Sequence, residues 1–294
     1  MTIEQAKAAR SISLKGMAIN LLLFIIKGAA GLMIHSVSLL SDAIHSLTDI
    51  ISTLIVLIGL KISSKPADEG HPYGHDRIEC IIALLLGIML FGIGGIISWE
   101  GICKLKVPTV YQDYGVLLGF AAIGSAVISI VAKEWMYRFT IRCAKKIGSP
   151  SMAADAWHHR SDAISSIGSL VGVCGIYLGY PIIDIAACFI ISAFVFKAAL
   201  GICLDACRRL IDVAGDSTVV EAIKESILQN SEVLSIDLIK TRLFGSKLYV
   251  DIEVTLNRDL SFEQSHKIAH TIHDIVDSSY EMVNDCTVHV NPSE

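Results

Sequence analysis

Long apolar stretches fill most of the chain, and short polar connections separate them. They cover residues 12–34, 37–63, 78–103, 112–137, 151–178 and 182–206. Each is long enough for an α-helix to cross the roughly 30 Å of hydrocarbon in a bilayer. The pattern therefore predicts six membrane-spanning helices.

A different pattern begins after about Leu210, where the apolar runs end and shorter amphipathic segments follow. These segments predict a helix over 216–230, strands over 233–240 and 248–256, a helix that the capping box of Ser261 and Gln264 opens and that reaches about Ser279, and a strand over 286–290. This order is typical of a small ferredoxin-like α+β domain. We therefore predict a transmembrane domain over 1–208 and a cytoplasmic domain over 209–294.

Composition agrees with a polytopic membrane protein. Of 294 residues, 53% are hydrophobic and only 18% are charged, and the mean hydropathy is +0.59. The net charge of −5 and the absence of a basic block give no reason to expect a nucleic-acid partner. The eight Cys are scattered without a C-x-x-C motif, so no disulfide framework is predicted.

The positively charged residues between the apolar stretches lie mostly on one side of the predicted membrane. One side carries most of the positive residues, namely Lys7, Arg10, Lys15, Lys61, Lys65, Arg77, the run 138–146, Arg208 and Arg209. The other side carries only Lys104 and Lys106. Because positive residues favour the cytoplasmic side, both termini are expected in the cytoplasm. The polar start of the chain shows no signal-peptide pattern.

A repeated motif organises the apolar region. Residues 42–49 and 155–162 both read D-A-x-H-x-x-x-D, on the second and fifth predicted helices. With six spans these two helices run in opposite directions. The repeat therefore indicates two inverted three-helix halves, an arrangement in which substrate binds near the membrane midplane.

The motif supplies ionisable side chains to the membrane interior, where they are costly and usually mark an ion path. His45 with Asp49, and His158 with Asp162, are i,i+4 pairs on one helix face. Two imidazoles and two carboxylates form a closed tetrahedral shell that suits a borderline ion such as zinc. We call these four residues the membrane site. Asp42 and Asp155 stand nearer the segment starts, where capping or contact with water explains them equally well.

Two further groups of candidate ligands lie outside the membrane helices. Asp68, His71 and His75 form a compact connection between the second and third helices, and we call them the loop site. In the last helix, His266, His270, His273 and Asp277 form a polar stripe, and Asp251 and His289 point away from the predicted core. Metal ligation and an ordinary polar turn or solvated face both remain open for these groups.

The sequence Leu39-Leu40-Ser41-Asp42-Ala43, with the H-x-x-x-D that follows, resembles the second-helix signature of the cation diffusion facilitators. These are proton-coupled efflux transporters for zinc and related divalent ions. His158-x-x-x-Asp162 looks like their fifth-helix half-site, and residues 66–75 look like their loop site. The likeness extends to six helices followed by a ferredoxin-like cytoplasmic domain, and so covers nearly the whole chain.

The resemblance implies specific roles. The membrane site would carry the transported ion, and Asp68, His71 and His75 would bind a further metal. In the cytoplasmic domain Asp251, His266 and His289 would be ligands; we call these three the cytoplasmic site. Arg77 and Asp212 would pair between the two domains, and the protein would be a homodimer. Asn291 departs from the pattern, because some bacterial members carry Asp there. So does His45, where the bacterial zinc/iron efflux members carry Asp.

We therefore predict a metal/proton antiporter of the cell (inner) membrane rather than an enzyme. Its substrate would be Zn²⁺ first, with Cd²⁺, Fe²⁺, Mn²⁺ or Co²⁺ as further candidates, and Zn²⁺ would also serve as a structural or regulatory ligand. Protons would be the counter-ion, since imidazole and carboxylate bind metal only when deprotonated.

Two rival functions come from other classes. An ion channel uses rings of carboxylates, but a closed tetrahedral shell binds too tightly for fast conduction. An intramembrane metalloenzyme keeps a coordination position open for water, which four protein ligands leave no room for.

Overall fold

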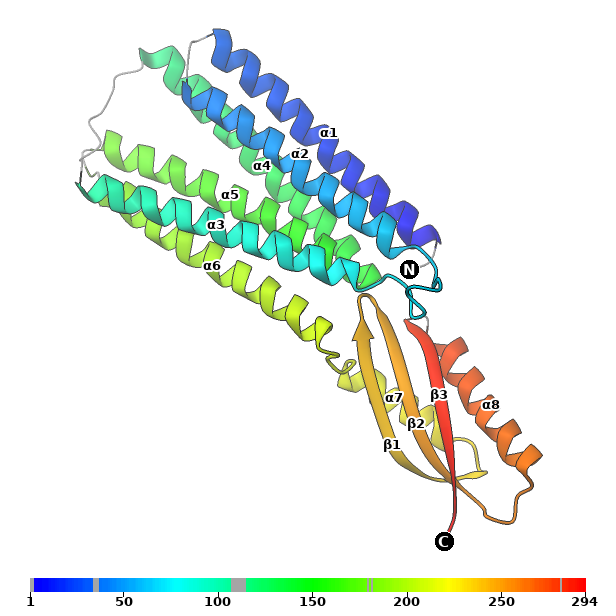
Figure 1. The fold of residues 1–294 in the computed structure, drawn as a ribbon. Coiled ribbons are helices and arrows are strands. Elements are labelled where there is room, and N and C mark those ends of the chain that lie inside the picture. Colours follow the sequence, from blue (N-terminus) through cyan, green and yellow to red (C-terminus); the bar gives the residue numbers. More distant parts are fainter. Residues whose placement is uncertain (1–2, 34–36, 107–114, 179, 181, 281) are drawn as a thin grey trace. The chain divides into compact units, whose positions relative to one another are not determined.

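The computed structural model describes residues 3–33, 37–106, 115–178, 180, 182–280 and 282–294. The chain divides into two compact units, Met1–Ala206 and Cys207–Glu294. Within the described residues the first unit is built from six long helices. They are α1 (Ile3–Met33), α2 (Val37–Ser63), α3 (Ile78–Lys106), α4 (Gly115–Ile147), α5 (Pro150–Tyr177) and α6 (Ile182–Leu210). Successive helices run in alternate directions, so α2 and α5 are antiparallel (Figure 1).

Several helices extend beyond the apolar stretches that predicted them. α1 begins at Ile3, and α4 continues through the basic run to Ile147. Lys, Arg, Ala and Glu are good helix formers, so the backbone stays helical after the apolar run ends. Hydropathy marks the end of a membrane segment better than the end of a helix.

Four of the helices are long and apolar enough to cross a membrane by composition alone, among the residues that the structure describes. These candidate spans are Lys7–Ala29, Ala43–Ser63, Ile78–Lys106 and Ile182–Leu210. α5 is less apolar because it carries Asp155, His158, His159, Arg160 and Asp162. Crossing by α4 and α5 stays a prediction.

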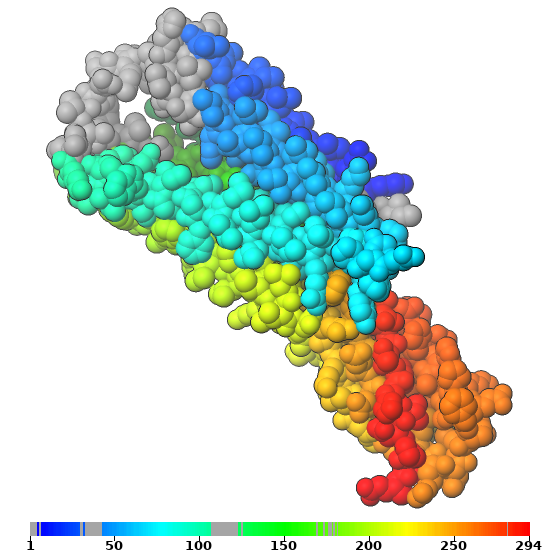
Figure 2. Space-filling view, viewed as in Figure 1, coloured from blue at the N-terminus to red at the C-terminus, as the bar shows by residue number. Residues whose placement is uncertain are grey.

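The outer surface of the first unit is apolar. α3 and α6 lie side by side on the face seen in Figure 2, and both expose large aliphatic and aromatic side chains, among them Ile81, Ile88, Ile96, Ile190 and Phe194. A soluble monomer rarely exposes so much apolar surface. In a bilayer the same surface faces lipid tails.

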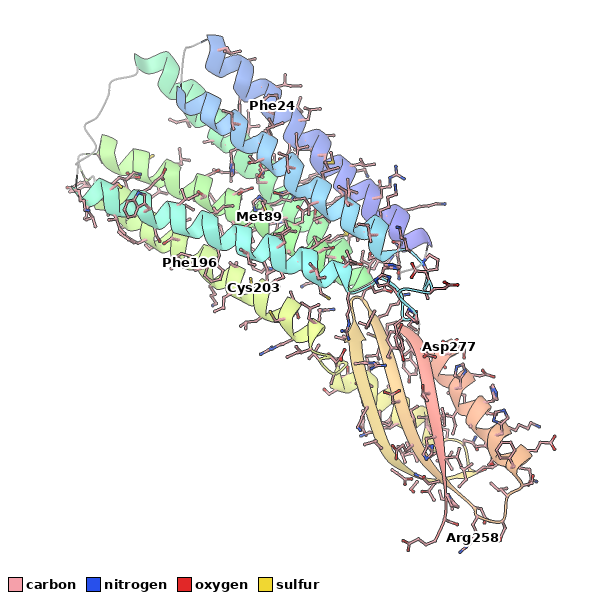
Figure 3. All side chains as sticks on the ribbon, in the orientation of Figure 1. Phe24, Met89, Phe196, Cys203, Arg258 and Asp277 are labelled. Atoms are coloured by element: carbon pink, nitrogen blue, oxygen red, sulfur yellow. The ribbon has the colours of Figure 1, made fainter. Side chains whose placement is uncertain are left out.

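Glycines allow α3 and α6 to approach closely. A Cβ at Gly87 would lie 2.6 Å from the sulfur of Cys203, and one at Gly94 would lie 3.1 Å from the ring of Phe196; Figure 3 labels both α6 side chains. Small residues at such contacts are the usual way in which membrane helices pack. Gly168 and Gly172 of α5 meet Ile191 and Asp184 of α6 in the same way.

The start of α5 is held by a buried carboxylate. Glu79, at the start of α3, accepts hydrogen bonds from Ser149, Ser151 and Ser63. The hydroxyl of Ser149 also accepts from the backbone N–H of Met152, 3.4 Å away. The side chain of Glu79 thus joins the ends of α2, α3 and α5 on one side of the helix bundle.

The second unit is a small α+β domain. It contains α7 (Ser217–Leu228), β1 (Val233–Phe244), β2 (Lys247–Leu256), α8 (Phe262–Ser279) and β3 (Val283–Pro292). The sheet order is β1-β2-β3, with β1 and β2 antiparallel and β2 and β3 parallel. Alternate residues of β2 (Leu248 to Leu256) form a core with Ile223, Ile227, Ile268, Ile272 and Val276 of the two helices. The predicted element order and the capping box at Ser261 are confirmed.

Candidate metal centre

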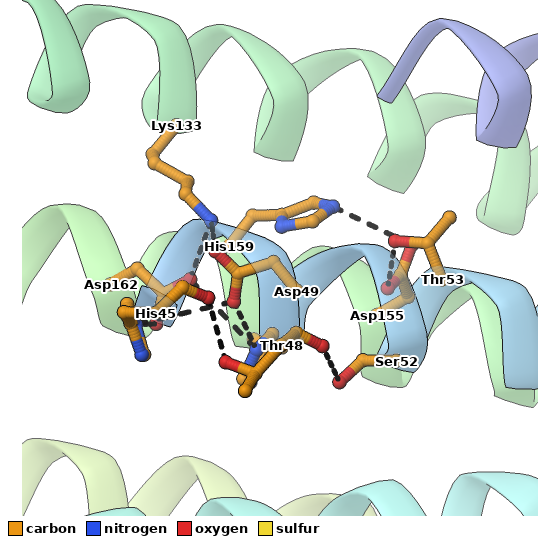
Figure 4. Close-up of polar contacts among 10 residues, drawn as sticks. His45, Thr48, Asp49, Ser52, Thr53, Lys133, Asp155, His159 and Asp162 are labelled. Atoms are coloured by element: carbon orange, nitrogen blue, oxygen red, sulfur yellow. Dashed lines mark hydrogen bonds and ion pairs between the residues drawn. The ribbon is translucent and has the colours of Figure 1, made fainter. Parts of the chain in front are cut away.

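The two halves of the repeated motif meet between α2 and α5 (Figure 4). His158 Nε2 of α5 lies 3.1 Å from Asp49 Oδ1 of α2. In return, His45 Nε2 of α2 lies 3.4 Å from Asp162 Oδ1 of α5. Each helix thus offers its imidazole to the carboxylate of the other. The four predicted ligands of the membrane site lie together although the half-sites are 113 residues apart in sequence.

The membrane site is buried on all sides but one. The side chains of Asp49, His158 and Asp162 are 1%, 7% and 6% exposed, whereas that of His45 is 48% exposed. Ligand atoms of His45, Asp49 and Asp162 all lie within 4.8 Å of one another, close enough to share one ion. His158 Nε2 stands beside this group, 3.9 Å from Asp162 Oδ2. The site is therefore a shell of two imidazoles and two carboxylates, and solvent or lipid can reach it on the side where His45 lies.

A fifth ionisable residue reaches the same carboxylates, and the sequence analysis did not identify it. Lys133 of α4 is buried; its Nζ donates to Asp162 Oδ2 at 2.9 Å and to Asp49 Oδ2. A signal was available, because a lysine inside the apolar stretch 112–137 marks an intramembrane charge. Its partners could not be read from the sequence, since α4 contributes no part of the repeat.

One turn away, a second His–Asp pair lies beside the membrane site. Asp155 accepts a hydrogen bond from Thr53 Oγ1 at 3.3 Å and lies 3.5 Å from His159 Nε2. Both side chains of this pair are buried. Asp155 therefore links α2 to α5 and does not face water at a helix end. The side chain of Asp42 lies outside the described part of the chain.

The three residues of the loop site lie close together because the chain turns between Asp68 and His75. His71 Nδ1 lies 3.3 Å from Asp68 Oδ1, and His75 Nε2 lies 3.5 Å from Asp68 Oδ2. The three residues offer ligand atoms within 4.8 Å of one another. The backbone N–H of His71 donates to Asp68 at 2.8 Å, and this bond holds the pKa of the Asp68 carboxyl below its usual value. The carboxylate is thus ready as a ligand, but Asp68 and His71 are exposed to solvent.

The cytoplasmic site is not assembled within one chain. Among the described residues, the groups of potential ligands that share an ion-sized space do not include Asp251, His266 or His289. The reason is the fold: α8 packs Ile268, Ile272 and Val276 onto the sheet and turns His266 outward. There His266 stacks on Phe262 and contacts the ring of His270. Metal binding by these three residues stays a prediction, as does the ion pair of Arg77 with Asp212, which belong to different units.

Asn291 has a role of its own in the second unit. Its Nδ2 donates to Asp237 Oδ2 at 3.0 Å, and Thr255 donates to the same oxygen at 2.7 Å. These bonds hold the pKa of Asp237 below its usual value. An aspartate at 291 would place two carboxylates together, so the neutral amide fits this sheet.

Comparisons with known proteins cover both units. The family model of the cation efflux transmembrane domain matches residues 14–211. The model of the cation efflux protein cytoplasmic domain matches residues 216–293.

Similar proteins come from archaea and bacteria. An uncharacterized transporter of Methanocaldococcus jannaschii is 36% identical, over 92% of this chain and 94% of its own length. The manganese efflux system protein MneP of Bacillus subtilis is 31% identical over 99% of both chains. The magnetosome protein MamB of Paramagnetospirillum magneticum is 30% identical, over 91% of this chain and 88% of its own.

The described helices, the His/Asp site between α2 and α5, and the two family matches lead to one conclusion. The protein is an integral membrane transporter, not an enzyme, and belongs to the cation efflux family, the cation diffusion facilitators.

Proposed function

We propose that this protein exports a divalent metal ion from the cytoplasm in exchange for protons, with the membrane site as the place where the ion binds. The observation that carries the proposal is that α2 and α5 each place a histidine against the aspartate of the other helix. His158 faces Asp49, and His45 faces Asp162. Among the described residues, His45, Asp49 and Asp162 are the one group inside the helix bundle whose ligand atoms could share an ion, and His158 lies beside them.

Zinc is the ion that this ligand set favours. Imidazole nitrogen is a borderline ligand that suits zinc, whereas a site made only of carboxylates suits harder ions such as manganese. A tetrahedral shell of two nitrogens and two oxygens is within the usual range for zinc. Manganese is the second candidate, since MneP is named for manganese efflux; Cd²⁺, Fe²⁺ and Co²⁺ follow.

Proton coupling follows from the same ligands. Imidazole and carboxylate must lose their protons before they coordinate a metal, so protons and metal compete for one site. Histidine has an unperturbed pKa of about 6.5 and changes charge near physiological pH. If α2 and α5 open the site alternately to the two sides, this competition moves metal outward and protons inward.

The setting of the site completes the proposal. The protein would act as a homodimer in the plasma membrane, with both termini and the second unit in the cytoplasm. The loop site and the cytoplasmic site would add structural or regulatory zinc.

Purified protein in lipid vesicles tests this function. With metal outside and an acidic lumen, we expect saturable Zn²⁺ uptake that raises the luminal pH, and no uptake by D162A protein. The same assay with Mn²⁺, Cd²⁺, Fe²⁺ and Co²⁺ ranks the substrates. Uptake that rises linearly with metal and ignores the pH gradient would indicate a channel.

A further inference from the structure

Lys133 and the two histidines of the membrane site contact different oxygen atoms of its two carboxylates. Its ammonium bonds to Oδ2 of Asp49 and lies 2.9 Å from Oδ2 of Asp162. The Oδ1 atoms face the imidazoles, at 3.1 Å from His158 and 3.4 Å from His45. The ammonium therefore lies on the same pair of carboxylates that a metal ion would coordinate.

Charge arithmetic makes the ammonium and the metal competitors. Two carboxylates with one ammonium leave a net charge of minus one, and two carboxylates with a divalent ion and neutral imidazoles leave zero. All three charged side chains together with a divalent ion would leave an extra positive charge next to the metal. Buried charges without a partner are strongly unfavourable, and close like charges repel strongly at low dielectric. Lys133 and the metal should therefore not share the carboxylates.

We propose that Lys133 is a tethered cation that takes turns with the metal ion on the Asp49–Asp162 pair. When metal binds, the ammonium leaves the two Oδ2 atoms; when metal departs, the ammonium returns and offsets one of the two negative charges. Because the side chain of lysine has a flexible four-carbon stem, its ammonium can move while the backbone of α4 stays in place. The inference rests on the proposed function, because it assigns the metal to this site.

This exchange has two consequences for transport. The competing ammonium lowers the affinity of the site, so the metal is released more readily. It also keeps Asp49 and Asp162 partnered after release, which stabilises the helix bundle between transport cycles. A lysine that only held the helices together would produce the second effect without the first.

Replacement of Lys133 by methionine tests the inference. Methionine keeps an unbranched side chain of similar length and removes the charge. We expect K133M to bind Zn²⁺ about tenfold or more tightly in equilibrium titration, the size expected when one nearby like charge is lost. Transport should slow because release slows. Without metal the melting temperature should fall, and Zn²⁺ should raise it by more than in the wild type.

The matched control is K104M. Lys104, in the last turn of α3, also pairs with a carboxylate, 2.8 Å from Asp184 in the first turn of α6, but the pair includes none of the four ligands. It should leave the Zn²⁺ affinity unchanged. An unchanged affinity in K133M, with binding still lost in D49A and D162A, would overturn the inference and leave the proposed function standing. These titrations use protein that also carries H71A, H75A and H266A, so that the loop site and the cytoplasmic site are disabled. Binding that survives D49A and D162A in this background would overturn both.

A second measurement serves if K133M does not fold. Wild-type protein with ¹⁵N-labelled lysine side chains gives an ammonium signal for Lys133, which the charge-conserving K133R variant assigns by its loss. Saturating Zn²⁺ should shift this signal and leave that of Lys104 in place. An unmoved Lys133 signal at full Zn²⁺ occupancy would refute the exchange.

Discussion

The membrane site and the loop site are built from the same two side-chain types in opposite surroundings. In the loop, Asp68 is exposed, and its carboxylate accepts a hydrogen bond from the backbone N–H of His71. In the membrane, Asp49 and Asp162 are buried, and their partners come from three different helices. The loop ligands span only eight residues, whereas the membrane ligands depend on the whole bundle.

The difference shows what burial demands of a metal-binding carboxylate. An exposed carboxylate is stabilised by water whether or not metal is bound. A buried one needs a compensating charge at every stage of a transport cycle. Lys133 supplies that charge in the membrane site, and the loop site has no comparable lysine among its described contacts. A buried lysine is therefore found at the site that is proposed to bind and release the transported metal.

The largest effect should come from removing a buried carboxylate. Asp49→Ala or Asp162→Ala takes one of four ligands and also one partner of Lys133. We expect the initial rate of Zn²⁺ transport to fall by on the order of 100-fold or more, given that even supporting residues around a metal site affect function by 10–100-fold. Vesicle uptake measures the rate.

The control for this prediction is Asp184→Ala. Asp184 is a buried carboxylate of α6 that pairs with Lys104, away from the membrane site. The D184A protein should still transport zinc. If D49A or D162A protein transports near the wild-type rate, the membrane site is not the transport site.

A smaller effect should follow from exchanging the ligand type at His45. His45→Asp keeps a metal-binding side chain one turn from Asp49 and replaces nitrogen with a harder oxygen ligand. We expect continued zinc transport with a broader ion range that includes cadmium and manganese. Initial rates for each ion, with wild type and variant side by side, measure the range. An unchanged ion profile would mean that the half-exposed His45 is not a ligand.

The smallest effect should come from the loop. His71→Ala leaves the membrane ligands intact and removes one exposed imidazole. We expect a less than about tenfold loss of apparent metal affinity, since an exposed site with few ligands binds weakly. Transport should persist. Complete loss of transport in well-folded H71A protein would place the loop in the ion path and remove the contrast between the two sites.

The sequence predicted the fold class because its two patterns are strong. Apolar runs of about 20 residues are specific for membrane helices, and the strict alternation in β2 is specific for a half-buried strand. The four membrane-site residues were predictable for a similar reason: the D-A-x-H-x-x-x-D motif occurs twice. Their mutual contacts required only that α2 and α5 pack together.

His159 was missed although its partner Asp155 lies four residues earlier on α5. Lys133 and Glu79 were not predicted, for a different physical reason. Each is a single buried polar residue, and its partners lie at unrelated places in the sequence. Local periodicity carries no information about such pairs. The cytoplasmic site stays a prediction, because α8 turns His266 away from the sheet that carries Asp251 and His289.

Zinc K-edge X-ray absorption tests the central claim most directly. The protein should carry His71→Ala, His75→Ala and His266→Ala, so that the loop and α8 cannot contribute their ligands. With one equivalent of Zn²⁺, we predict two imidazole nitrogens and two oxygens at about 2.0–2.2 Å, and loss of this spectrum when Asp49→Ala is added. A shell that contains sulfur, or one that Asp49→Ala leaves unchanged, would contradict the assignment of the membrane site.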